Sequence, residues 1–134
     1  MAQARLNRAC PSFPVADVFA TAEYYRDVLG FSFDRFDGNP PSFVILERDA
    51  ARLMFKQVAP EAMPRPADKR SLLQYDVFFE ADDVTALADE LRARGAEIVQ
   101  EPIDRPIWNG RELVVRDIDG RVLCFGQRLE EATS

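Results

Sequence analysis

Histidine is absent from the 134-residue chain. Its absence excludes Ser-His-Asp and Cys-His catalysis, zinc sites that contain histidine, and a histidine pH switch. The only cysteines, Cys10 and Cys124, are too few for the disulfide framework of a secreted protein. No segment approaches the ~20 apolar residues of a membrane span, and residues 1–8 lack the apolar run of a signal peptide. We therefore expect a cytoplasmic, bacterial protein with no membrane partner.

Basic residues are also scarce relative to acidic ones. The chain has 17 lysines and arginines against 23 aspartates and glutamates, which gives a formal charge of −6. This balance disfavours nucleic acid as a partner and favours neutral or cationic ligands. Hydrophobic residues make up 47% of the chain and charged residues 30%, as in a globular protein. We expect one domain over residues 1–134, with a core that needs no disulfide.

Two segments have the apolar spacing of amphipathic helices, Phe19–Leu29 and Val84–Arg94. Asp17 precedes the first, and Asp82 or Asp83 precedes the second, where a carboxylate can cap the free amides. A glycine follows each segment, as is typical of a helix end. Both helices are short, so we expect each to cover one face of a sheet.

Strands are predicted where aromatic and β-branched residues gather. The predicted strands are Phe31–Phe36, Ser42–Glu47, Arg52–Lys56, Leu72–Glu80, Glu97–Val99, Glu112–Arg116 and Arg121–Phe125. The last two are joined by a turn in which Gly120 supplies a positive φ.

The two halves of the chain repeat one plan of strand, helix and three strands. Asp17-Val18 recurs as Asp83-Val84, and the same offset carries Cys10 onto Asp76. The repeat predicts two modules, at about 8–57 and 71–128, joined by a proline-containing linker over 58–70.

Five segments carry a resemblance to a known family: Phe13–Val18, Tyr24–Arg26, Leu29–Phe31, Trp108–Leu113 and Val115–Arg121. They resemble the vicinal oxygen chelate superfamily, which includes glyoxalase I, extradiol dioxygenases and bleomycin resistance proteins. The run around Trp108 is most similar to the bleomycin resistance branch. The resemblance implies an α+β fold of two tandem βαβββ modules, forming a half-barrel-like mixed sheet that lines a cleft. It also implies a homodimer.

Metal enzymes of this superfamily place a ligand on the first and fourth strands of each module. In this chain those positions correspond to Cys10, Met54, Asp76 and Cys124. Two thiols, a thioether and one carboxylate do not suit a hard divalent ion. We therefore expect no metal and no other cofactor. The alternative is a zinc site made by the two thiolates with Asp76.

A ligand cleft is the expected functional feature. Trp108 would stack on a flat or cationic group, or else fill the space between the modules. Asp76 would pair with a basic ligand, or else form a salt bridge with a neighbouring arginine or lysine. Cysteines like Cys10 and Cys124 are more often small buried apolar residues than reactive thiols. The candidate ligand-binding residues are Trp108, Arg111, Asp76, Phe78, Met54, Cys10 and Cys124.

The function that the resemblance implies is sequestration of a basic or aromatic small molecule, such as a bleomycin-type antibiotic. Binding without turnover needs no catalytic residues, and none is predicted here. The alternative is a lyase, an isomerase or a dioxygenase-like enzyme. In a lyase or isomerase, Asp76 or Glu80 would act as the base.

Overall fold

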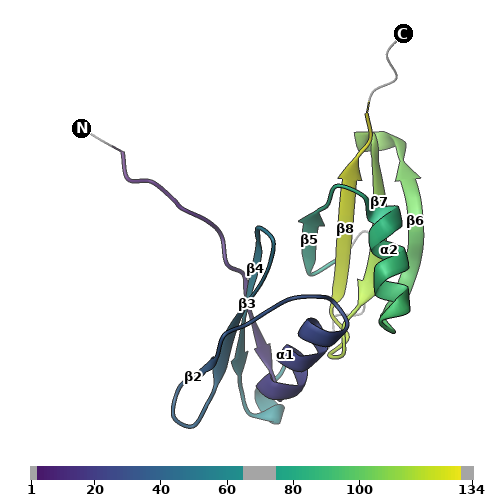
Figure 1. Cartoon of the computed structure of the whole chain (residues 1–134). Helices are drawn as coiled ribbons and strands as arrows, with labels where there is room; N and C mark the ends of the chain where they lie inside the picture. Colours follow the sequence, from purple (N-terminus) through teal and green to yellow (C-terminus); the bar gives the residue numbers. More distant parts are fainter. Residues whose placement is uncertain (1–2, 65–74, 131–134) are drawn as a thin grey trace.

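A computed structural model describes residues 3–64 and 75–130, and in it two four-stranded sheets each carry one helix (Figure 1). The first sheet has the strand order β1-β4-β3-β2, and the second has the order β5-β8-β7-β6. The elements of the first module are β1 (Ser12–Val15), α1 (Val18–Asp27), β2 (Phe36–Asp37), β3 (Phe43–Arg48), β4 (Ala51–Gln57) and the short helix η1 (Pro60–Ala62). Those of the second are β5 (Val77–Glu80), α2 (Val84–Ala93), β6 (Glu97–Arg105), the short helix η2 (Pro106–Trp108), β7 (Gly110–Arg116) and β8 (Val122–Arg128).

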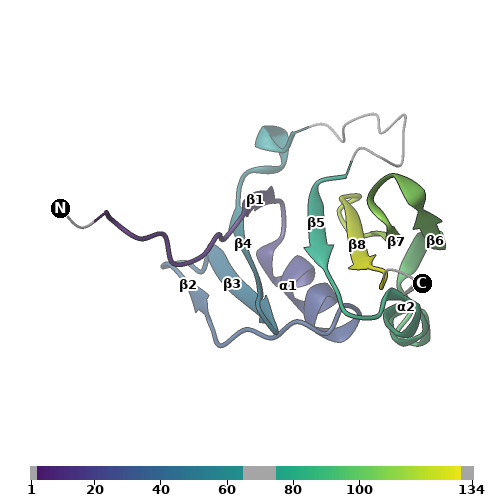
Figure 2. The same cartoon turned by 90° about the horizontal axis from the view of Figure 1, so that it is seen from above.

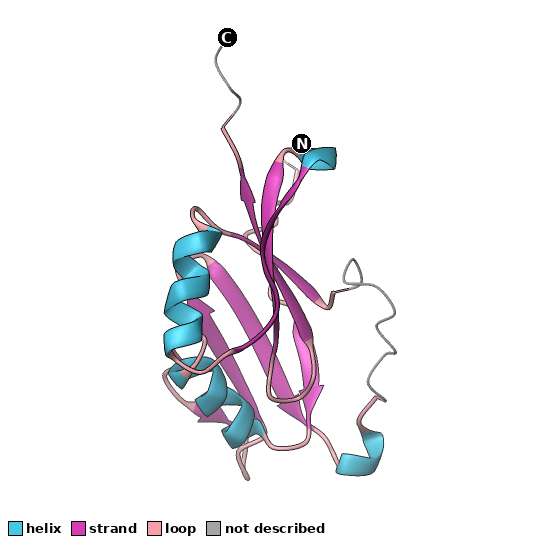
Figure 3. Cartoon of the chain, turned by 90° about the vertical axis from the view of Figure 1, so that its right-hand side faces the viewer, coloured by secondary structure: helices cyan, strands magenta, loops and turns pink. Residues whose placement is uncertain are grey.

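The two modules have the same topology, which confirms the predicted α+β fold of paired βαβββ units. In each module the first strand pairs in parallel with the fourth, and the other pairs are antiparallel. The edge strands β1 and β5 lie on the facing sides of the two sheets (Figure 2). Both helices lie on one side of the sheets, which leaves the other side open (Figure 3). No helix in the described ranges is long and apolar enough to cross a membrane.

Side-chain caps start both helices. The Asp17 carboxylate accepts hydrogen bonds from the backbone amides of Phe19 and Ala20, and Asp83 accepts one from Ala86. A glutamine from the last strand of each module adds a second contact. Gln57 Oε1 accepts from Val18 N at 2.9 Å, and Gln127 Oε1 accepts from Val84 N at 3.0 Å. The glutamine caps fix each helix against its own sheet.

Three predicted strands differ from the observed ones. The predicted strand Phe31–Phe36 reduces to Phe36–Asp37 and one isolated bridge at Ser32, because Phe31 turns into the core, where it is 4% exposed. The predicted Glu97–Val99 extends to Arg105 through two register shifts, which let the strand bend. In the predicted Leu72–Glu80 only Val77–Glu80 is a strand, and residues 72–74 lie outside the described residues, as do 65–70 of the linker.

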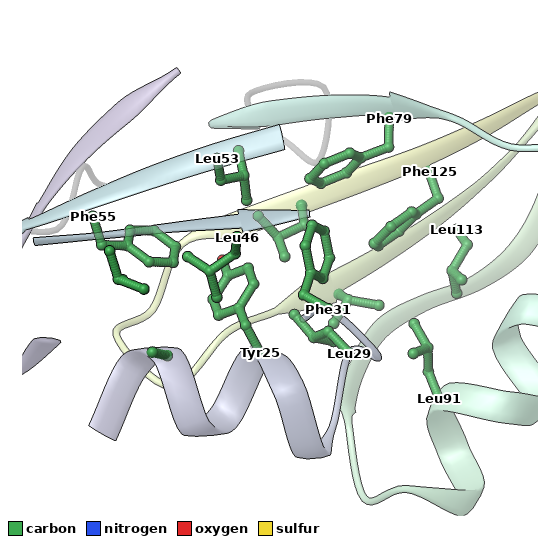
Figure 4. Close-up of a cluster of buried hydrophobic side chains, with 14 of the residues drawn as sticks. Tyr25, Leu29, Phe31, Leu46, Leu53, Phe55, Phe79, Leu91, Leu113 and Phe125 are labelled. Atoms are coloured by element: carbon green, nitrogen blue, oxygen red, sulfur yellow. The ribbon is translucent and has the colours of Figure 1, made fainter. Parts of the chain in front are cut away.

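One hydrophobic core lies between the helices and the sheets and includes residues of both modules (Figure 4). Strand alternation decides which side chains enter it. In β7 and β8 the core residues are Leu113, Val115, Leu123 and Phe125. The intervening residues therefore face the open side, where Val114, Val122 and Cys124 form a second, smaller cluster.

A buried ion pair of the second module lies at the seam, which is the contact between the two modules. Arg121 Nη1 lies 3.1 Å from the Asp117 carboxylate and 2.9 Å from that of Asp119. Tyr25 of α1 donates its hydroxyl to Asp117 at 2.6 Å, and burial is the main reason that the pKa of Tyr25 is raised well above 10.0. The turn between β7 and β8 thus anchors the second module to the helix of the first.

Candidate functional site

Two aromatic rings pack against two glycines of neighbouring strands, on the open side of the second sheet. A Cβ on Gly110 would lie 2.0–2.2 Å from three atoms of the Trp108 indole, so the ring rests directly on this glycine. A Cβ on Gly126 would lie 2.2 Å from Phe78. The Phe78 and Trp108 rings meet edge to face, with centroids 6.1 Å apart. Asn109, at φ 54°, makes the turn that folds Trp108 back over β7.

The indole is held by a buried carboxylate. Trp108 Nε1 donates to Glu112 at 2.9 Å, and Glu112 is only 4% exposed. Arg105 Nε lies 3.3 Å from the same carboxylate and donates through its Nη2 to Gln100 at 2.9 Å. A buried carboxylate needs such partners, because losing its hydration is costly. The network therefore fixes the plane of Trp108 without a contribution from a ligand.

A cavity of about 530 Å³ opens beside the two rings. Its walls are Phe78, Glu80, Ala81, Asp82, Trp108, Gly126 and Arg128. Phe78 is 40% exposed, and the Arg128 guanidinium carbon lies 5.8 Å from the Trp108 ring centroid. The cavity thus combines two aromatic surfaces with two carboxylates and one guanidinium. Such a lining can hold a flat group against the rings and a basic group near the carboxylates.

Trp108 and Phe78 are the two predicted site residues that the structure brings together. Cys124 lies on the same face of the sheet but is fully buried beneath it. Burial, followed by the nearby Glu112 charge, raises the pKa of its thiol to about 12. Cys124 therefore stays protonated at neutral pH, and it packs with Val114 and Val122 in the smaller apolar cluster rather than lining the cavity.

The other four predicted residues lie elsewhere. Arg111 faces away from the cavity, where its Nε donates to Asp104 at 2.7 Å. The Asp76 carboxylate accepts a hydrogen bond from Val122 N at 2.9 Å, so it links the residue before β5 to the first residue of β8. Met54 lies on β4, in the first sheet.

The sequence predicts Cys10 on the first strand, but in the structure β1 starts two residues later, at Ser12. Proline at position 11 lacks an N–H group to continue the ladder, so β1 starts at Ser12. The superfamily's four ligand positions thus offer a partly buried thiol, a thioether, an occupied carboxylate and a buried thiol that holds its proton. These donors do not fit a hard divalent ion. Among residues 3–64 and 75–130 no three Cys, Asp or Glu side chains form a group that could hold a metal.

The sequence analysis named Glu80 only as the base of the alternative enzyme, and it did not name Asp82, Arg128 or Glu112 as site residues. Glu80 and Asp82 enter the cavity because they follow Phe78 at two-residue spacing, and that alternation was visible in the sequence. Arg128 and Glu112 gave no such signal. Arg128 lies at the end of β8, and Glu112 becomes important only because η2 folds Trp108 onto it.

The chain was compared with known proteins. The sequence profile described as the Glyoxalase/Bleomycin resistance protein/Dioxygenase superfamily matches residues 5–125. A search among curated proteins finds no match.

Similar solved structures include TioX from Micromonospora sp. ML1, at 20% identity and a TM-score of 0.70 over 92% of this chain and 100% of that one. TnmS3, an antibiotic-binding protein from Streptomyces sp. CB03234, is 22% identical, with a TM-score of 0.70 over 95% and 100% of the chains. A bleomycin-binding protein complexed with bleomycin is 22% identical, with a TM-score of 0.69 over 92% and 100%. At these identities the likeness establishes the fold.

Proposed function

Because the chain belongs to the Glyoxalase/Bleomycin resistance protein/Dioxygenase superfamily, we propose that it binds a basic, aromatic small molecule without transforming it. The observation that carries this proposal is the cavity beside Phe78 and Trp108, with Glu80 and Asp82 on its wall. The descriptions of two similar structures, an antibiotic-binding protein and a bleomycin-binding protein, support a ligand of this kind.

The binding mode follows from the two kinds of surface in the cavity. A flat group of the ligand packs against Phe78 and the indole of Trp108, which is held in place before the ligand arrives. A cation over such a ring contributes about 0.5–2 kcal/mol, depending on how much water is excluded. A basic group of the ligand lies near Glu80 and Asp82, and because both residues are exposed, this attraction weakens with salt.

Arg128 competes with a cationic ligand for the Trp108 ring. Its guanidinium already lies within cation–π distance of Trp108, so a cationic ligand must displace it or stack elsewhere on the ring. Arg128 is exposed, and a long exposed side chain moves at little cost. We therefore expect Arg128→Ala to strengthen the binding of a cationic ligand and to weaken that of an anionic one.

Calorimetric titration with bleomycin tests the proposal. Trp108→Ala should lower the affinity at every salt concentration, whereas Glu80→Gln should lower it mainly in dilute buffer. The matched controls are Phe19→Ala, an exposed aromatic residue on α1, and Glu23→Gln, an exposed carboxylate on the same helix. If bleomycin and other cationic aromatic drugs give no heat of binding, the sequestration proposal is wrong, and an enzyme with Glu80 as its base becomes the better account.

We further propose that the protein works without a metal. The donor chemistry at Cys10, Met54, Asp76 and Cys124 supports this, because the set lacks the carboxylates that a hard ion requires. Elemental analysis after mild purification should find less than one equivalent of Zn, Ni, Fe or Mn per chain. One equivalent that is lost in Cys124→Ala would overturn this part of the proposal.

A two-fold dimer is the expected assembly. Two exposed apolar side chains support it. The N-terminal segment 3–11 extends away from both sheets (Figure 1) and carries Leu6, which is 96% exposed. Ile107, next to Trp108 in the sequence, is 93% exposed. Burying both side chains against a second copy would stabilise the pair. Light scattering should give about twice the 15.2 kDa chain mass, and a monomer at micromolar concentration would contradict this expectation.

A further inference from the structure

A second cavity, of about 490 Å³, opens at the seam between the modules on the helix side of the sheets. Its apolar floor includes Phe31, Phe79 and Phe125, which face one another in Figure 4. It shares the segment Glu80–Asp82 with the Trp108 cavity, and its other walls are different. The function proposed above makes no use of this space.

The internal repeat shows what the equivalent space contains on the other side of the seam. Gln57 and Gln127 cap the two helices in the same way and therefore occupy equivalent positions. Six residues before each glutamine, Ala51 on β4 is equivalent to Arg121, just before β8. The chain thus has an arginine at one end of the seam and an alanine at the matching position of the other.

Arg121 fills its side of the seam with a guanidinium group. Its guanidinium carbon lies 5.6 Å from the Phe13 ring centroid and 5.3 Å from that of Phe55. Its Nη1 lies 3.1 Å from the carboxylate of Asp117 and 2.9 Å from that of Asp119. The space is therefore shaped for a planar cation between aromatic rings and carboxylates.

The second cavity has matching rings but no matching cation. Phe79 and Phe125 pair across the strands as Phe13 and Phe55 do, and their rings stack with centroids 4.9 Å apart. Where the first module has Tyr25, eight residues after its helix cap, the second has Leu91. An arginine and a tyrosine are thus replaced by an alanine and a leucine, and the cavity is the space they leave.

The charge around this cavity favours a cation. The carboxylates on its walls belong to Asp49, Glu80, Asp82, Asp83 and Glu90, and the only guanidinium among its described residues is that of Arg48. Arg48 is already engaged, because its Nη1 and Nη2 donate to Glu90 at 2.8 and 2.9 Å and Nη1 also donates to the Leu29 carbonyl at 2.9 Å. Its Nε also lies 3.9 Å from the Asp49 carboxylate, at the limit of an ion pair. One guanidinium thus faces five carboxylates, and those of Glu80, Asp82 and Asp83 form no ion pair with Arg48 among the described lining residues.

We propose that the seam cavity binds the guanidinium group of a small molecule, in the position that Arg121 occupies on the other side. The group lies against Phe79 and Phe125, with its N–H groups directed to the carboxylates on the wall. Its alkyl or aryl tail passes out between α2 and the turn that joins β3 to β4. This site shares the wall segment Glu80–Asp82 with the Trp108 cavity but uses different aromatic rings, and its existence does not depend on the function proposed for that cavity.

The test uses n-butylguanidinium chloride, with n-butylurea as the neutral molecule of the same shape. Titration followed by ¹H–¹⁵N spectra should move the amide signals of Ala86, Leu87 and Glu90 along saturable curves with the cation only. The indole N–H signal of Trp108 should stay in place, which distinguishes this site from the other. Equal shifts with the urea, or no saturation, would overturn the proposal.

Ala51→Arg is the decisive variant, because it supplies the missing guanidinium from the chain itself. It should weaken the binding of n-butylguanidinium at least tenfold, while Ala59→Arg, which adds the same charge at an exposed position outside the cavity, should leave it nearly unchanged. Unweakened binding in Ala51→Arg would contradict the proposal. If that variant does not fold, Asp49→Asn replaces it, since asparagine tolerates the φ of 52° at this turn. Asp49→Asn should weaken binding by two- to fivefold, and an unchanged affinity would refute the site.

Discussion

Replacing Gly110 by alanine tests how the binding surface is made. The backbone of Gly110 is extended within β7 and accepts an alanine without strain, so any cost must come from the added methyl group. That group would lie 2.0–2.2 Å from three indole atoms, so the Trp108 ring must move away from residue 110. Its hydrogen bond to the buried Glu112 is then lost, at a cost of about 2–3 kcal/mol for a bond to a charged group. In a chain of this size the midpoint of thermal unfolding should fall by roughly 6–12 °C.

A double-mutant cycle isolates this effect. Circular dichroism during urea unfolding gives the stability of the wild type, Gly110→Ala, Trp108→Ala and the double variant. With the indole removed, the methyl group meets no ring, so Gly110→Ala should cost less than about 0.5 kcal/mol in the Trp108→Ala background. An equal cost in both backgrounds would show that the backbone requires glycine at position 110, and that packing of the Trp108 ring is not the reason for it.

Other predictions concern the seam and the thiols. Asp117→Ala should lower the free energy of unfolding by about 3–5 kcal/mol, because the Arg121 side chain, which is 10% exposed, then loses a buried carboxylate partner. Adding Arg121→Met should recover part of that loss in urea unfolding. In native protein at pH 8 a disulfide reagent should titrate Cys10 alone, and Cys124 only after unfolding; two fast thiols would contradict the burial of Cys124. The pKa of Cys124 is raised from 9.0 to about 12, so the unfolded chain loses this proton first. The free energy of unfolding should therefore fall as the pH rises from about 9 towards 12, less steeply in Cys124→Ala, and identical slopes would count against the raised pKa.

The sequence was most informative where local chemistry acts alone. Asp17 and Asp83 cap their helices as the pattern of aspartate and apolar residues predicts, and the repeat between the modules follows from the same positions. Phe78 and Trp108 were also found as candidates, the first from strand alternation and the second from its resemblance to a known run. Apart from the repeat, which compares two distant segments, each of these inferences used residues only a few positions apart.

The rest of the site depends on contacts between distant segments. Asp76 was interpreted as the partner of a basic ligand or of a neighbouring arginine or lysine; its hydrogen bond from the amide of Val122, 46 residues away in the chain, gave no signal in the sequence. Local spacing also does not show that Asn109 makes the turn and that Gly110 receives the indole. Arg111 follows it on the face of β7 that points away from the cavity. Neither the register of a strand nor the partner of a long side chain can be read from local spacing.

Trp108 is the residue proposed to meet the ligand, and the chain has no other tryptophan. A ¹H–¹⁵N spectrum therefore contains one indole N–H signal, which reports on this cavity alone. Addition of bleomycin should move that signal along a saturable curve that reaches its end near one ligand per site, and Gly110→Ala should weaken the effect. Bleomycin binding that is measurable by calorimetry but leaves the indole signal in place would contradict the assignment of this cavity as the binding site.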